Sequence, residues 1–197
     1  MHSDQITADL RAHFQLQDFQ LVLKKEWAST QDQYRQKIRQ YIFDTVHSDE
    51  KILELHERPW ILGRGLSISH NRICGGFMTS SEHQHIGFDM EINERLHVAN
   101  ISRYSVNKNE SAQAPTAACL WTAKEAAFKA IPKSDQPNVI GQIEIGDWNQ
   151  ISAHLFTCRM IRIKNKIVMD SLGLVSVSEH QTYAFFKLTE RIPCAGF

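Results

Sequence analysis

The sequence lacks an excess of either charge, because 22 lysines and arginines are balanced by 22 aspartates and glutamates among its 197 residues. Proteins that coat nucleic acid carry a strong positive excess, so this balance argues against that class. Glycine and proline are also scarce, at nine and five residues, while 42% of the chain is hydrophobic. This composition is typical of a folded globular protein and excludes a fibrous or disordered chain.

Paired cysteines and long apolar runs are missing as well. Cys74, Cys119, Cys158 and Cys194 form no Cys-x-x-Cys pair, which argues against a zinc knuckle. The longest uncharged stretch, 111–123, is too short and too polar to cross a bilayer. The first residues show neither the basic nor the apolar segment of a secretory signal. We therefore expect a cytoplasmic protein with reduced thiols and with neither a membrane nor a nucleic-acid partner.

The spacing of apolar residues predicts an α+β protein. Helices are expected at 6–15, at 29–46 and from Pro115 to about Ala130. Strands are expected at 66–69, 73–78, 86–93, 139–148, 154–163, 173–178 and 182–188, with a bulge at Gly75-Gly76 and loops around 59–65 and 100–115. Long helices among meandering strands favour a largely antiparallel sheet. The character of the chain changes near 80–84, where we place an internal boundary.

The strand expected at 86–93 carries two acids, Asp89 and Glu91, on one face. Adjacent carboxylates repel each other unless a cation lies between them, and Mg²⁺ prefers carboxylates together with substrate phosphates. The same alternation also fits an ordinary strand with one face in water. The spacing alone leaves both interpretations open.

The helix that follows Pro115 places Trp121, Glu125 and Lys129 along one stripe, because they recur every four residues. A Glu–Lys pair at this spacing is often only a surface stabiliser, although a solvated face seldom carries a tryptophan. A second stripe is made mostly of small residues and would allow close approach to a sheet. It consists of Leu120, Ala123, Ala127 and Ala130.

The strand expected at 66–69 alternates and is followed by His70. A lone histidine at the end of a strand is more often structural than catalytic. His83 and His85 precede the acidic strand, but no recognised zinc spacing is present.

Three runs, in this order, resemble the signature of the 4′-phosphopantetheinyl transferases. They are Ser-Ile-Ser-His at 67–70, Ile-Gly-Phe-Asp-Met-Glu at 86–91 and Trp-Thr-Ala-Lys-Glu-Ala-Ala-Phe-Lys-Ala at 121–130. The resemblance implies an enzyme that transfers the 4′-phosphopantetheine group of coenzyme A to a serine of an acyl or peptidyl carrier protein and releases 3′,5′-ADP. Coenzyme A would be the co-substrate and Mg²⁺, or alternatively Mn²⁺, the cofactor. Such enzymes serve fatty acid, polyketide or nonribosomal peptide biosynthesis.

The resemblance also implies the metal site and the catalytic groups. Asp89, Glu91 and Glu125 would bind the metal ion. Glu125 would orient or activate the attacking serine, and Lys129 would contact the phosphates and aid proton transfer.

Coenzyme A would be held by further residues of these runs. His70 and the backbone at Ser69 would contact its phosphates, and Arg58 with Pro59 would lie near the adenine and the 3′-phosphate. Lys124 matches a lysine position of the family's helix motif and is either a phosphate contact or structural. Further basic residues are candidates for the 3′-phosphate, or are simply solvated: Lys24, Lys25, Arg35 and Arg39.

The length resembles a small version of the family's two-unit type, a pseudo-dimer with coenzyme A in the cleft between its units. We therefore expect a monomer of two similar α+β units in a pseudo-two-fold arrangement. The N-terminal half, 1–83, would lie on the adenine side of coenzyme A, and the C-terminal half, 84–197, would carry the metal site. The family docks its carrier protein on the connection at 100–114, where Arg103 and Lys108 are candidate docking charges or solvated loop residues.

Two other functions compete with the transferase. One is a catalytically idle module that binds coenzyme A or a carrier protein, against which the intact Asp89, Glu125 and Lys129 argue. The other is a generic Mg²⁺-dependent phosphoesterase that hydrolyses coenzyme A without a carrier, and it has no motif of its own in the sequence.

Overall fold

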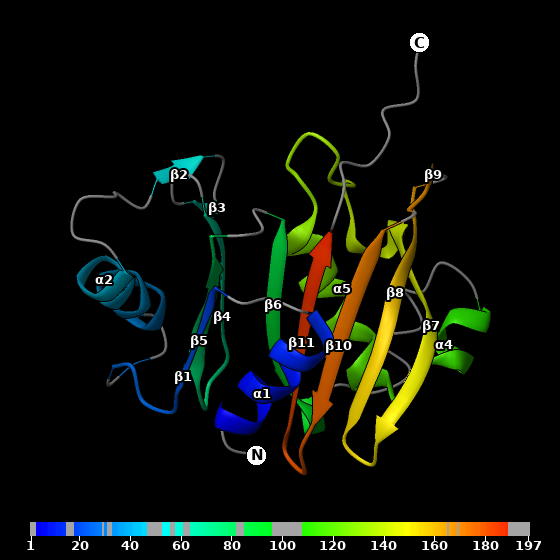
Figure 1. Cartoon of the computed structure of the whole chain (residues 1–197), viewed down its shortest axis with the longest axis horizontal. Coiled ribbons are helices and arrows are strands. Elements are labelled where there is room, and N and C mark those ends of the chain that lie inside the picture. Colours follow the sequence, from blue (N-terminus) through cyan, green and yellow to red (C-terminus); the bar gives the residue numbers. More distant parts are fainter. Residues whose placement is uncertain are drawn as a thin grey trace.

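The computed structural model describes residues 3–14, 18–28, 30, 33–46, 53–55, 58–60, 64–81, 85–95, 108–164, 166–168 and 170–188. Within these residues the protein is α+β, with four helices and two antiparallel sheets of three and six strands (Figure 1). The expected fold class and antiparallel pairing are confirmed. The pseudo-two-fold likeness of two halves stays a prediction.

The helices are α1 (Ser3–Phe14), α2 (Tyr34–Val46), α4 (Lys108–Gln113) and α5 (Ala117–Ala130). The strands are β1 (Phe19–Lys24), β2 (Leu53–Leu55), β3 (Arg58–Trp60), β4 (Gly65–His70), β5 (Gly75–Ser80), β6 (Ile86–Ile92), β7 (Ile143–Ser152), β8 (Leu155–Ile163), β9 (Lys166–Ile167), β10 (Ser171–Val177) and β11 (Gln181–Leu188). None of these helices is long and apolar enough to cross a membrane.

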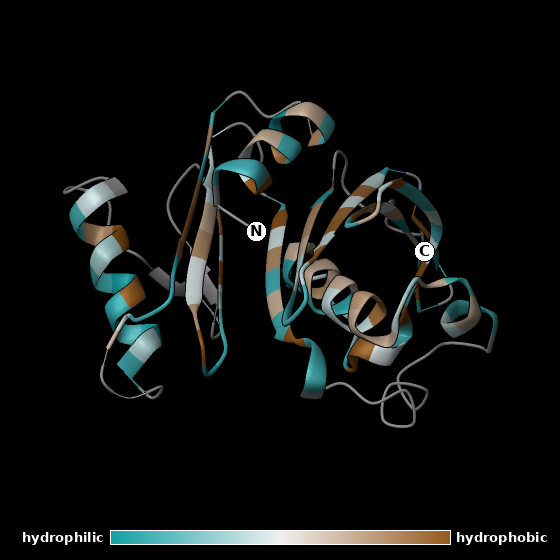
Figure 2. Cartoon of the chain, turned by 90° about the horizontal axis from the view of Figure 1, so that it is seen from below, coloured by the Kyte–Doolittle hydropathy of each residue, from teal (hydrophilic) through white to brown (hydrophobic). Residues whose placement is uncertain are grey.

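The two sheets are formed by successive parts of the chain. The three-stranded sheet has the order β1-β5-β4, and the larger sheet has the order β6-β11-β10-β8-β7 with β9 beside β8. Strands β2 and β3 form a separate antiparallel pair. In Figures 1 and 2, α2 covers the outer face of the small sheet, whereas α1 and α5 lie on opposite faces of the large one. Strand β6 is therefore the edge of the large sheet that faces the small sheet.

A hydrophobic core beneath α1 joins the two sheets. Ile6, Leu10 and Phe14 follow one face of α1, are buried, and pack with Met78 of β5 and Phe185 of β11. A second core lies between α5 and the large sheet, and a third lies between α2 and the small sheet. The chain passes from one sheet to the other between β5 and β6, but the two sheets share one of their cores.

The two helices predicted at 29–46 and from Pro115 to about Ala130 both begin later than predicted. Helix α2 begins at Tyr34 rather than near 29, after a turn in which the Gln33 amide donates to the Thr30 carbonyl (3.2 Å). Helix α5 is capped by Thr116, whose hydroxyl accepts a hydrogen bond from the Cys119 amide (3.0 Å). Pro115 therefore precedes the helix instead of lying in its first turn.

The bulge predicted at Gly75-Gly76 is wrong, because both glycines pair in regular register with β1 and β4. A Cβ atom on Gly76 would overlap the Val22 carbonyl oxygen, so the glycine permits close packing of strands rather than a bend. The strand β1 itself, the β2–β3 pair, β9 and the short helix α4 are additions to the predicted elements.

Candidate functional site

Strand β6 and helix α5 approach each other closely because small residues meet where they cross. A Cβ atom on Gly87 of β6 would overlap the Ala126 carbonyl oxygen and lie 2.7 Å from the Ala130 nitrogen. The predicted close approach of the small-residue face is thereby confirmed, and this face also includes Ala126. Its alanines Ala123, Ala126, Ala127 and Ala130 are all buried.

The stripe of Trp121, Glu125 and Lys129 faces the acids of β6. The Lys129 ammonium lies 2.7 Å from Asp89 Oδ1, and the Trp121 indole donates a hydrogen bond to the Glu91 carboxylate. Glu125 lies between them along the helix and senses the charges of both acids. The stripe is therefore not a solvated surface stripe, and the three residues belong to one polar cluster.

Asp89 does not lie on a wet face of its strand. Only 5% of the residue is exposed, because α5 and β4 both cover it, so the interpretation of an ordinary solvated strand face is wrong for this position. Phe88 and Met90 point to the opposite side, into the core that joins the sheets. The Phe88 ring stacks on Phe185 with 5.1 Å between ring centroids.

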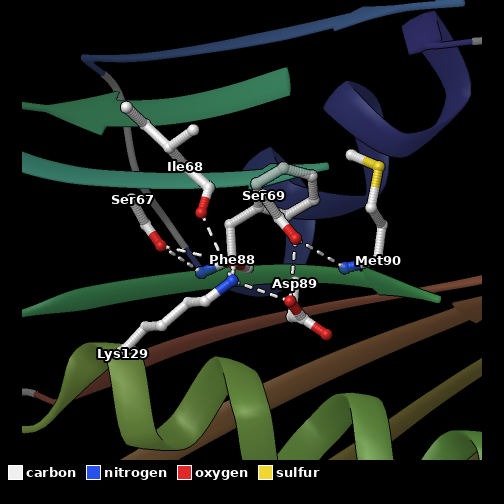
Figure 3. A network of polar contacts seen from close by, with 7 residues as sticks. All are labelled: Ser67, Ile68, Ser69, Phe88, Asp89, Met90 and Lys129. Atoms are coloured by element: carbon white, nitrogen blue, oxygen red, sulfur yellow. Dashed lines mark hydrogen bonds and ion pairs between the residues drawn. The ribbon is translucent and has the colours of Figure 1, made fainter. Parts of the chain in front are cut away.

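The open edge of β6 is bound by serine side chains of β4 (Figure 3). The Phe88 amide donates to Ser67 Oγ (2.8 Å), and the Met90 amide donates to Ser69 Oγ (3.3 Å). Ser69 Oγ in turn donates to Asp89 Oδ1 (2.8 Å). The two serines thus provide partners for amides that an edge strand otherwise leaves without a neighbouring strand.

The Lys129 ammonium fills the space between α5, β4 and β6. Besides Asp89 Oδ1 it donates to the carbonyl oxygens of Phe88 (3.2 Å) and Ile68 (3.3 Å). These three acceptors match the three N–H bonds of an ammonium group. Lys129 therefore links the two sheets as well as neutralising Asp89.

The second carboxylate oxygen of Asp89 has a different environment. Oδ2 is buried, and among the residues that the structure describes no donor bonds to it. Figure 3 shows it pointing away from Ser69 and Lys129. Leaving a buried acceptor of this kind without a partner costs about 1–3 kcal/mol, which a bound cation would offset.

The other two acids are held in a strained electrostatic environment. Burial, and then repulsion by Asp89, raises the pKa of Glu125 to about 7, while Lys129 opposes the shift. Burial and Asp89 also raise the pKa of Glu91, against the hydrogen bond from Trp121. Three carboxylates around one ammonium leave an excess of negative charge, which favours a hard divalent cation.

The donor chemistry therefore fits Mg²⁺ or Mn²⁺ at Asp89, Glu91 and Glu125. Their oxygens are not, however, gathered into a finished coordination sphere. Across the described part of the chain, no group of three His, Cys, Asp or Glu side chains converges closely enough to form a ready-made metal site.

His70 lies at the end of β4, on the side of the site that faces α2. Its ring is 6.3 Å from the Tyr34 ring. Burial, then the positive charges of Lys129 and Arg35, lower the pKa of His70, while Asp89 opposes them. The structure thus brings His70 within reach of the charges of the Asp89–Lys129 pair, with Arg35 on its other side along α2.

Other residues named from the sequence lie apart from this cluster or outside the described part. Lys124 is fully buried, and its ammonium lies 2.7 Å from Glu110 Oε1. Of the two roles expected for Lys124, phosphate contact or structural, this position fits the structural role. The Lys24 ammonium lies 3.6 Å from the centre of the Tyr41 ring. Arg58 belongs to β3, but its side chain lies outside the described residues, as do Arg103 and the side chain of Lys108.

Sequence reasoning missed the part played by Ser67, because it assigned neither face of β4 to the core. Ser67 and Ser69 are buried, whereas Leu66 and Ile68 are only half-buried. The available signal was the Ser-x-Ser pair itself, because two hydroxyls at alternate positions of a strand lie on one face. Nothing local shows that the edge of another sheet would meet that face.

Comparison with known proteins adds no assignment. A scan against protein-family models finds no match, and a search of curated proteins finds no relative.

Proposed function

We propose that this protein transfers the 4′-phosphopantetheine group of coenzyme A to a serine of an acyl or peptidyl carrier protein and releases 3′,5′-ADP. One observation carries the proposal: the three runs that resemble the transferase signature meet at Asp89. Asp89 Oδ1 accepts from Ser69, 20 residues earlier, and from Lys129, 40 residues later. Residues so far apart in the chain converge around one buried carboxylate, whose second oxygen receives no hydrogen bond from the described residues.

The reaction places defined demands on these residues. The serine oxygen of the carrier attacks the phosphorus that bears the pantetheine arm, so that a new P–O bond forms and the bond to 3′,5′-ADP breaks. The serine proton passes to a base. In this proposal Glu125 is the group that orients the serine or accepts its proton, as the resemblance implies.

Asp89, Glu91 and Glu125 would hold a Mg²⁺ or Mn²⁺ ion. When bound, such an ion neutralises charge on the pyrophosphate and orients it. Lys129 adds a fixed positive charge beside the carboxylates, where charge builds up during transfer. Trp121 restrains Glu91 from the other end of the stripe.

The side of the site formed by β4 and α2 supplies the binding of coenzyme A in this proposal. His70 and Arg35 lie there and would contact its phosphates, with Arg58 toward the adenine. The proposal includes a cytoplasmic monomer whose halves, 1–83 and 84–197, are α+β units in a pseudo-two-fold arrangement with coenzyme A between them. The carrier protein would dock on the connection at 100–114, which includes α4.

The test is incubation of the full chain with coenzyme A, Mg²⁺ and a panel of apo carrier proteins, followed by intact-mass spectrometry. The proposal predicts that at least one carrier gains the mass of one phosphopantetheine arm, and that EDTA prevents the gain. A carrier whose acceptor serine is replaced by alanine is the matched control. Coenzyme A binding without transfer would favour the idle module, and hydrolysis without a carrier would favour the phosphoesterase.

A further inference from the structure

We propose that Ser69 is a positioning residue for Asp89: its hydroxyl, with the Lys129 ammonium, holds Oδ1 so that Oδ2 alone is presented to a divalent cation. This inference rests on the proposed function and concerns the side chain of Ser69, whereas the contact expected with coenzyme A is through the Ser69 backbone. Ser69 is 5% exposed, and its hydroxyl is already bonded to Asp89 and to the Met90 amide.

The direction of the Ser69 hydroxyl is fixed by its neighbours. A hydroxyl has one proton to donate and can accept two hydrogen bonds. The Met90 amide must be the donor in its contact with Ser69 Oγ (3.3 Å), so the Ser69 proton is free to point at Asp89 Oδ1 (2.8 Å). Hydrogen bonds to an ionised carboxylate are among the stronger ones in proteins.

The two oxygens of Asp89 are therefore unequal. Oδ1 accepts from Ser69 on β4 and from Lys129 on α5, whereas the described residues provide no donor to Oδ2. Two donors from opposite elements prevent rotation of the carboxylate about its Cβ–Cγ bond. Without the Ser69 hydroxyl, the carboxylate can turn toward Lys129 and share both oxygens with the ammonium, which competes with a cation.

Ser67 offers a matched control on the same strand. It is as buried as Ser69, at 3% exposed, and its hydroxyl binds the backbone of β6 through the Phe88 amide (2.8 Å) and carbonyl (3.3 Å). Among the described residues, no hydrogen bond joins it to the Asp89 side chain. Removing either hydroxyl weakens the link between β4 and β6, but only Ser69→Ala releases Asp89.

The experiment measures Mn²⁺ affinity by calorimetry for the full-length wild type, Ser69→Ala, Ser69→Thr and Ser67→Ala, with no coenzyme A present. Groups that orient a metal ligand typically affect affinity by about 10–100-fold. We expect a loss in that range for Ser69→Ala, recovery of most of the affinity in Ser69→Thr, which keeps the hydroxyl, and near wild-type affinity for Ser67→Ala. Should Ser69→Ala fail to fold, Ser69→Cys takes its place, because it keeps the side-chain volume. We expect Ser69→Cys to show the same loss of Mn²⁺ affinity as Ser69→Ala.

Equal affinities for the Ser69→Ala and Ser67→Ala variants would overturn the inference, because the hydroxyl of Ser69 would then only link the strands. If the two alanine variants bind Mn²⁺ equally well while the wild type still modifies a carrier, the proposed function stands and only the positioning role of Ser69 is lost. A wild type that binds no Mn²⁺ overturns both the inference and the metal site on which it rests.

Discussion

The buried ion pair between Lys124 and Glu110 allows a quantitative prediction about stability. Both side chains are fully buried, and the Lys124 ammonium lies 2.7 Å from Glu110 Oε1. Glu110 Oε1 also accepts from the Ile145 amide (2.8 Å), and Lys124 donates to the Ile143 carbonyl. The pair thus ties α4 and α5 to β7. Removal of either partner leaves the other charge in the core.

Loss of one member of such a pair costs about 3–5 kcal/mol. Glu110→Ala also leaves the buried Ile145 amide without its hydrogen-bond acceptor, which adds about 1–3 kcal/mol to the cost. We therefore expect Glu110→Ala to lower the free energy of unfolding by at least about 4 kcal/mol and Lys124→Met by about 3–5 kcal/mol. The double variant Glu110→Leu with Lys124→Met should be more stable than either single variant, because it leaves no buried charge.

Urea unfolding, followed by circular dichroism and tryptophan fluorescence, measures these differences. Strictly additive losses in the double variant, or a loss below about 1 kcal/mol for Glu110→Ala, would contradict the buried pair. The same variants separate the two roles of Lys124. Folded Lys124→Met should keep the wild-type affinity for coenzyme A, whereas a phosphate-binding lysine would not.

Three further predictions concern the site itself. Gly87→Ala should lower the free energy of unfolding by more than about 2 kcal/mol, because the new methyl group would overlap Ala126; an unchanged thermal midpoint would contradict the tight crossing of β6 and α5. Burial raises the pKa of Glu125 from 4.5 to about 7, so the folded state keeps a proton that the unfolded state releases. In EDTA, stability should therefore fall as pH rises through this interval, by at most about 3 kcal/mol, and Glu125→Gln should flatten that slope in urea unfolding at pH 5 and 8. His70→Ala should weaken coenzyme A binding in calorimetry and leave the turnover number largely intact; lost turnover at unchanged affinity would refute the binding role.

Much of the site follows from local periodicity. The two-residue spacing of Asp89 and Glu91 placed them on one face of a strand, and the four-residue spacing of Trp121, Glu125 and Lys129 placed them on one stripe of a helix. Both patterns hold in the structure, where the stripe and the acids face each other. Periodicity is reliable here because each pattern depends only on the geometry of one element.

The rest depends on contacts between distant elements. Lys124 and Lys129 lie on one helix, yet one is buried against Glu110 and the other is bonded to Asp89. The burial of Asp89 arises because β4 meets the edge of β6, which no window around either strand contains. Strand β1 was missed for the same reason, since it is defined by its pairing with the distant β5.

The most direct test of the central claim compares the wild type with Asp89→Asn in the carrier modification assay, both folded and both supplied with coenzyme A and Mg²⁺. Asparagine keeps an oxygen that can accept from Ser69 and Lys129 but removes the negative charge that a cation requires. We expect Mg²⁺-dependent transfer by the wild type and a loss of more than about 100-fold in Asp89→Asn. Transfer at the wild-type rate by Asp89→Asn, or no transfer by the wild type to any carrier, would contradict it.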